Sequence, residues 1–155
     1  MRRAMNAIRR LVRALRLGNR QAEGRAGISA AQLFVLQCVG RSGPLSLKAV
    51  AARTATDQSS VSVVVDRLAR RGLVSRRRAA QDARRLEIAL TPRGTAVLAR
   101  APGRAAPHAL LRGLRELPPG ELRRLARLLD RVVVSMGFGE RAPRMLFEDE
   151  DRTAR

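Results

Sequence analysis

Midway along the chain the hydrophobic pattern changes its period, and this change limits the folds that are open to the sequence. Residues 57–71 carry apolar side chains at helical spacing, and Arg70-Arg71-Gly72 has the cations and the glycine that are typical of a helix C-terminus. Two short segments follow, Leu73–Arg78 and Arg85–Leu90, and the second alternates apolar residues with others as a half-buried strand does. The polar stretch Ala79–Arg84 lies between them. The sequence therefore predicts a helix followed by a two-stranded hairpin.

Two helices and a short third one are predicted before this unit. Residues 1–17 repeat apolar side chains at helical spacing among arginines, and Gly18 with the polar residues after it is expected to end that helix. Ser29 and Gln32 have the spacing of a capping box ahead of an apolar run, which marks the start of a second helix. Ser46 stands where an N-cap of the third helix would be.

More helix is predicted after the hairpin. Thr91-Pro92 combines an N-cap with a proline at the first helical position. This helix is expected to break near Pro102-Gly103 and again before Pro107, because proline cannot donate a helical hydrogen bond. Residues 117–121 open a last amphipathic helix. Residues 138–155 mix glycine, proline and clustered acids, which predicts a flexible acidic tail.

The charge of the chain favours a polyanionic partner. There are 32 Lys and Arg residues against 13 Asp and Glu, so the formal net charge is +19. A basic N-terminal helix can also lie on anionic lipid, but this one lacks tryptophan and a wide apolar face, so no membrane partner is expected. All three aromatic residues are Phe, and the stacking platforms of single-strand and RNA binders are missing. Double-stranded DNA is the expected partner.

Several classes of protein are excluded by what the chain lacks. Its single cysteine, Cys38, rules out an internal disulfide framework and a thiolate zinc cluster, and its single histidine, His108, leaves no Ser-His-Asp triad. No carboxylate pair has a spacing suited to acid–base chemistry. We therefore expect no catalytic residues, no metal site, no cofactor and no enzymatic activity. No run is long enough to span a membrane, and arginines interrupt any signal-peptide core, so a cytoplasmic location is expected.

Residues 46–91 have the element order of a winged helix-turn-helix, and their motifs resemble those of the MarR family of bacterial transcription regulators. Each motif alone is weak, but all five stand in the family's order and spacing. They are Asp57-Gln58-Ser59-Ser60-Val61-Ser62, Val65-Asp66-Arg67-Leu68, Arg71-Gly72-Leu73-Val74, Asp82-Ala83-Arg84 and Leu90-Thr91-Pro92-Arg93-Gly94.

The resemblance implies a mainly α fold with a small two-stranded β-wing, in which the N- and C-terminal helices form a dimerisation region. It divides the chain into N-terminal helices (1–45), a DNA-binding lobe (46–91), C-terminal dimerisation helices (92–137) and the tail (138–155). The chain departs from the family at three places. Ala55 stands in the turn where glycine is common, and Val63 stands where an arginine often contacts DNA. Two prolines interrupt the fifth helix, where many members have a longer run.

Two groups of residues would contact DNA according to the resemblance. The N-terminal half of the recognition helix would read base edges in the major groove, where Gln can pair bidentately with adenine. The hairpin would place an arginine in the minor groove, with an acid that orients its neighbours. The recognition-helix residues are Gln58, Ser59, Ser60 and Ser62, and the wing residues are Arg76, Arg77, Asp82, Arg84 and Arg85.

The resemblance also implies a homodimer on a palindromic operator, acting as a repressor that a small aromatic or anionic ligand releases. The expected dimerisation residues are Ile8, Leu11, Leu15, Leu125, Leu129 and Val132. The expected ligand pocket is lined by Phe34, Cys38, Leu11 and Leu15, with Arg13 or Arg16 as a partner for an anion. Because the apolar neighbours of Cys38 favour a core role, no redox sensing is expected there.

One alternative stays open from the sequence alone. A basic architectural or nucleoid protein binds DNA without reading its sequence, and a net charge of +19 would suffice for that function. The recognition-helix motif argues against it.

Overall fold

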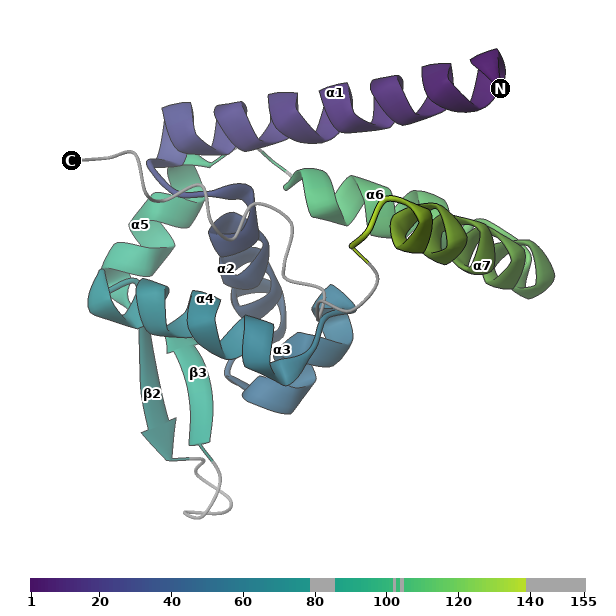
Figure 1. Cartoon of the computed structure of the whole chain (residues 1–155). Coiled ribbons are helices and arrows are strands. Elements are labelled where there is room, and N and C mark those ends of the chain that lie inside the picture. Colours follow the sequence, from purple (N-terminus) through teal and green to yellow (C-terminus); the bar gives the residue numbers. More distant parts are fainter. Residues whose placement is uncertain (79–85, 102, 104, 139–155) are drawn as a thin grey trace.

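The computed structural model describes residues 1–78, 86–101, 103 and 105–138, and it confirms a mainly helical fold with a small β-wing (Figure 1). The described elements, in chain order, are α1 (Arg2–Ala26), α2 (Ala30–Ser42), β1 (Leu45–Ser46), α3 (Leu47–Thr54), α4 (Gln58–Arg70), β2 (Val74–Arg78), β3 (Leu86–Leu90), α5 (Pro92–Arg100), α6 (Ala106–Arg115) and α7 (Pro119–Ser135).

The sheet has three antiparallel strands in the order β1-β3-β2, one more than the sequence predicts. The hairpin pairs Val74 with Leu90 at its base and Arg78 with Leu86 at its outer end. The additional strand is β1, whose Leu45 pairs with Ile88. A strand of two residues has no periodicity that a sequence pattern can detect. In Figure 1 the β2–β3 ribbon extends away from the helices, as a wing does.

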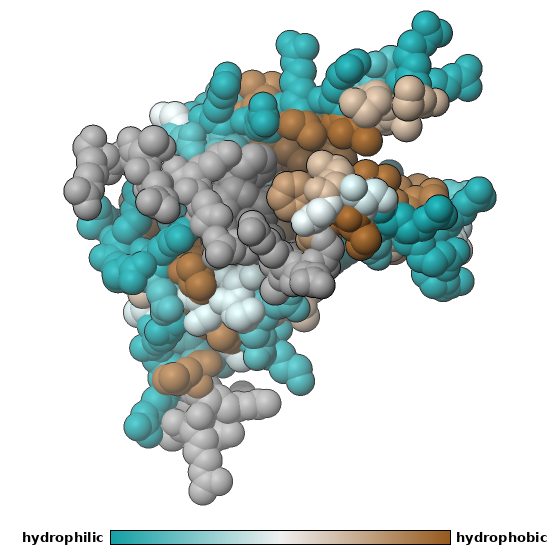
Figure 2. Space-filling view, in the orientation of Figure 1, coloured by the Kyte–Doolittle hydropathy of each residue, from teal (hydrophilic) through white to brown (hydrophobic). Residues whose placement is uncertain are grey.

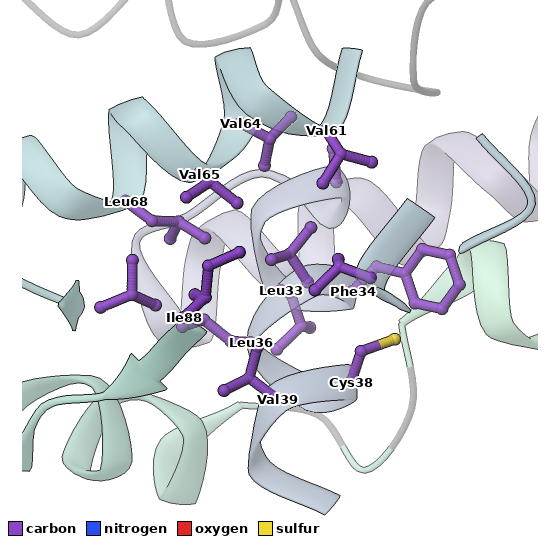
Figure 3. Close-up of a cluster of buried hydrophobic side chains, with 14 of the residues drawn as sticks. Leu33, Phe34, Leu36, Cys38, Val39, Val61, Val64, Val65, Leu68 and Ile88 are labelled. Atoms are coloured by element: carbon purple, nitrogen blue, oxygen red, sulfur yellow. The ribbon is translucent and has the colours of Figure 1, made fainter. Parts of the chain in front are cut away.

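Helix α2 is the centre of the molecule. Ten consecutive residues, Ala30–Val39, are buried, and α2 packs against α1, α3, α4, α5, α6 and β3. Its predicted capping box is confirmed: the Gln32 amide donates to the Ser29 hydroxyl, and the Gln32 side chain accepts from the Ser29 amide. Figure 3 shows Leu33 and Leu36 of α2 among buried side chains of α4 and β3. Because α2 packs against α3, α4 and β3, it shares one core with the elements of the winged helix.

The first helix is longer than predicted. Gly18 does not end it, and α1 continues to Ala26, with Gly27 in the left-handed conformation after it. Two tertiary contacts explain the difference. Buried Asn19 accepts a hydrogen bond from the Ala30 amide (2.7 Å) and donates to Glu23 (2.9 Å). A Cβ atom at Gly18 would overlap the side chain of Ala106, so the glycine allows α1 to approach α6 closely.

The other predicted helix ends agree with the structure. Ser46 and Thr91 accept hydrogen bonds from the Ala49 and Gly94 amides, as N-caps do. Asp57 occupies the N-cap position of α4, but its side chain makes no capping hydrogen bond. Helix α5 ends at Arg100 and α6 begins at Ala106, so the predicted break between them is confirmed.

Candidate nucleic-acid interface

The recognition helix α4 presents its predicted base-reading residues unequally. Gln58 and Ser59 are exposed and Ser62 is half-buried, so these three side chains lie on the face that points away from the core. Ser60 is only 9% exposed, because it falls on the same helix face as Val61 and Val64. Its predicted role in reading bases does not fit this burial. The available polar set is therefore Gln58, Ser59 and Ser62.

Helix α3 reaches α4 through a tight turn at Ala55. The backbone of Ala55 is left-handed (φ 51°), a conformation in which a Cβ atom is unfavourable and glycine is common. Its amide donates to the Ala51 carbonyl, and the buried Thr54 hydroxyl donates to the Val50 carbonyl (3.0 Å). These bonds satisfy backbone carbonyl groups at the end of α3, where the chain turns toward α4.

The C-terminal end of α4 is attached to two other parts of the molecule. Arg71 donates to the Gly27 carbonyl (2.6 Å) and to the Gln32 side chain (3.2 Å), which connects α4 to the α1–α2 junction. The Thr91 hydroxyl donates to the Gly72 carbonyl (2.6 Å), which connects α4 to the start of α5. Hydrogen bonds therefore connect the C-terminal end of the recognition helix to the α1–α2 junction and to the start of α5.

The wing carries exposed cations. Arg76, Arg77 and Arg78 all lie exposed on β2, and Arg77 stands opposite Glu87 in the register of the hairpin. Arg76 also forms an ion pair with Asp66 of α4. The sequence places Asp66 within a motif but carries no signal for this role, because the pair joins residues of different elements. The other predicted wing residues, Asp82, Arg84 and Arg85, lie outside the described residues.

The four residues predicted to line a ligand pocket are not brought together. Phe34 and Cys38 belong to the core (Figure 3), where they are 1% and 5% exposed. Leu11 and Leu15 line a groove of about 540 Å³ between α1 and α6, in which none of the described lining residues is charged. Arg13 and Arg16 line a different hollow on α1.

The one histidine of the chain, His108, is half-buried and lies next to Phe34. The His108 ring of α6 packs edge-on against Phe34, with ring centroids 4.5 Å apart, and lies 3.3 Å from the Arg41 guanidinium. Burial raises the pKa of the Cys38 thiol, and the nearby charges of Arg41 and Arg53 oppose that rise. Because the raised pKa keeps the thiol protonated, Cys38 is a poor nucleophile and acts as a small apolar core residue.

Apolar side chains remain uncovered on α1 and α7. No residue of α7 is buried, and its Leu129 and Val132 are 49% and 50% exposed. Ile8 and Leu11 of α1 are similarly exposed, whereas Leu15 and Leu125 are half-buried. Figure 1 shows α1 and α7 projecting from the body, and Figure 2 shows brown, apolar surface between them. A single copy of the chain thus leaves the predicted dimerisation residues largely in contact with water.

The described residues include neither a metal site nor a membrane span. They contain no group of three or more His, Cys, Asp or Glu side chains placed to hold a metal ion. Within the same residues, no helix has both the length and the apolar character needed to cross a bilayer.

Comparison with known proteins identifies relatives of this lobe. The model of the MarR family matches residues 26–85. The HTH-type transcriptional repressor MdtR of Bacillus subtilis is 34% identical over 68 residues, and this match spans 44% of each chain, less than half of the curated relative. The PcaV transcriptional regulator of Streptomyces coelicolor is 29% identical, with a TM-score of 0.56 over 86% of this chain and 97% of that one. BpsR of Bordetella bronchiseptica, whose DNA binding is regulated by 6-hydroxynicotinic acid, is 27% identical, with a TM-score of 0.55 over 82% and 90% of the two chains.

Proposed function

Because this chain belongs to the MarR family of transcription regulators, we propose that it is a homodimeric, sequence-specific regulator that binds double-stranded DNA and represses transcription. The observation that carries the proposal is the joint presentation of an exposed polar helix end and a basic ribbon. Gln58, Ser59 and Ser62 lie on the outer face of α4, and three exposed arginines lie on β2. The helix suits the major groove, and the ribbon suits phosphates and the minor groove.

The ion pair between Asp66 and Arg76 supports a single interface formed by both elements. It connects α4 to the wing, which favours contact of both elements with the same DNA duplex. Because the recognition helix offers few cations of its own in its first two turns, we infer that most of the affinity comes from phosphate contacts and most of the selectivity from α4.

The uncovered apolar faces support the homodimer. We propose that a second copy covers the exposed leucines and valines of α1 and α7, including Leu129 and Val132. Two-fold symmetry would place two recognition helices in successive major grooves, and the operator would then be palindromic. Exposed apolar surface of this kind on two projecting helices is otherwise costly in water.

A small ligand is proposed to release the repressor from DNA. The supporting likeness is to BpsR, whose DNA binding an aromatic acid regulates. In this chain the groove between α1 and α6 is the candidate site on the described residues, and its uncharged lining, which includes Leu11 and Leu15, favours the ring rather than the carboxylate of such a molecule. The ligand must bind the DNA-incompetent state more tightly, or it shifts no equilibrium.

The function is tested by selecting binding sites from a random duplex pool and footprinting the enriched sequence in the presence of competitor DNA. We expect one palindromic sequence to be protected, with symmetrical half-sites about one helical turn apart. Equal binding to all sequences would instead identify a sequence-indifferent architectural protein.

A further inference from the structure

Two apolar side chains of the winged-helix lobe, Val63 and Leu86, are exposed to solvent. Among the described residues, the large exposed apolar side chains lie almost entirely on α1, on α7 and just after α7. From α2 to α6 only Val63 and Leu86 belong to this set, at 39% and 59% exposure. Both stand on the two elements that would meet DNA, Val63 on α4 and Leu86 on the wing.

Val63 lies within the polar face of the recognition helix. Ser59 precedes it by one helical turn and Ser62 by one residue, whereas Val61 and Val64 point into the core. Its side chain is therefore an apolar surface bordered by the hydroxyl groups that are available for base contacts. A helix that enters the major groove would carry Val63 into the groove together with them.

The stability of the free protein does not account for this valine. A β-branched residue loses rotamer freedom in a helix, and because Val63 stays 39% exposed, burial offsets only part of that loss. Alanine, lysine, arginine or glutamate would favour the helix more at the same position. The apolar side chain is thus unfavourable until something covers it.

We propose that Val63 is a specificity-determining residue that contacts the C5-methyl group of a thymine in each half-site of the operator. In unmethylated DNA, thymine is the one base that presents a methyl group in the major groove, and protein apolar groups contact it there. The contact rejects cytosine at this position, because cytosine presents a hydrogen-bond donor and no methyl group. This inference rests on the proposed DNA-binding function and names one base of its site.

The test begins with the palindrome obtained by selection from unmethylated DNA. Each thymine of the half-site is replaced in turn by deoxyuridine, which keeps the base pairing and removes only the methyl group. For the unaltered protein we expect one thymine whose replacement weakens binding about three- to tenfold per half-site. The remaining thymines are internal controls. If the protein binds the operator and none of its thymines is sensitive to this replacement, the assignment is wrong.

Two matched variants then assign the contact to Val63. Val63→Thr keeps one methyl group, and Val63→Ser removes both, so the two variants differ by a single methyl group and share the hydroxyl. We expect Val63→Thr to retain a preference for thymine over deoxyuridine at the sensitive position and Val63→Ser to lose it. An unchanged preference in Val63→Ser would show that another residue contacts the methyl group. If the selection yields no sequence at all, the proposed function fails first, and this inference fails with it.

Discussion

The Arg76 guanidinium of β2 and the Asp66 carboxylate of α4 form an ion pair across the boundary between wing and recognition helix. The two side chains are 42% and 44% exposed, so the pair contributes at most about 1 kcal/mol to the free energy of unfolding. We expect its larger effect on DNA binding, because the carboxylate partly neutralises an arginine that would otherwise be available to phosphate.

Asp66→Asn should release Arg76 and increase binding to random DNA. We expect the slope of log affinity against log salt to steepen by roughly one ion per subunit, while the operator-to-random ratio falls. Fluorescence anisotropy over a salt series measures both quantities. Asp130→Asn is the matched control, since it makes the same charge change at an exposed position on α7. Equal effects of the two variants would argue against a specific role for Asp66.

Gln58→Ala and Arg77→Ala should separate base reading from phosphate attraction. Gln58→Ala is expected to lose about 1–3 kcal/mol of binding free energy on the operator and to leave the affinity for random DNA unchanged. The second should weaken binding to both DNAs and flatten the salt dependence by roughly one ion per subunit. Titrations with the operator and with a scrambled duplex measure both affinities for each variant. If the two variants lose affinity for the two DNAs in the same proportion, Gln58 and Arg77 do not have separate roles.

Val132→Asp should abolish the dimer without unfolding the chain. The side chain is 50% exposed in the single copy, so a carboxylate is tolerated there until a second copy would bury it. Light scattering of the unaltered protein should report twice the chain mass of 17.0 kDa, and the variant should report one chain mass. Ala52→Asp, at an exposed position of α3 in the winged-helix lobe, should remain dimeric. A monomeric parent protein would end the dimer proposal.

The Cys38 thiol should be inert in the native protein. Because burial raises its pKa, alkylation at neutral pH should be slow until denaturant unfolds the chain, and mild peroxide should not release the operator. Because the folded state favours the protonated thiol, the thiol stabilises the fold fully at pH values below its pKa in the unfolded chain, which is about 8.5. This stabilisation declines as the pH rises through the pKa of the thiol in the folded protein. Urea unfolding at several pH values should show this decline in the parent and not in Cys38→Ala. Peroxide-dependent release that vanishes in Cys38→Ala would overturn the assignment.

Gly94→Ala should destabilise the lobe, because a Cβ atom there would overlap the Leu73 carbonyl oxygen. We expect the free energy of unfolding to fall by about 2–4 kcal/mol, because the backbone at Leu73 or Gly94 has to shift to make room for the added methyl group. Gly24→Ala is the control: it lies in α1, and nothing lies within 4 Å of its added Cβ atom. That substitution should stabilise the helix by about 0.5–1 kcal/mol. Thermal unfolding of both variants measures the difference, and a neutral Gly94→Ala would disprove the close approach.

The sequence alone determined the order and the type of the main elements. The helical spacing of residues 57–71, the capping box at Ser29 and the N-cap at Thr91 are local signals, and each acts through contacts within a few residues. The motifs of residues 57–94 were sufficient to identify the MarR family for the same reason, since they lie close together in the sequence.

Tertiary structure decided what depends on residues far apart in the chain. Helix α1 continues past Gly18 because Ala106 of α6 and the Ala30 amide meet it there. Ser60 is buried by its orientation toward the core, although its neighbours Ser59 and Ser62 face outward. Tertiary packing also forms the ion pair of Asp66 with Arg76, and it places Leu11 and Phe34 in different environments. Such contacts depend on how helices pack, and packing is set by the whole core rather than by any one segment.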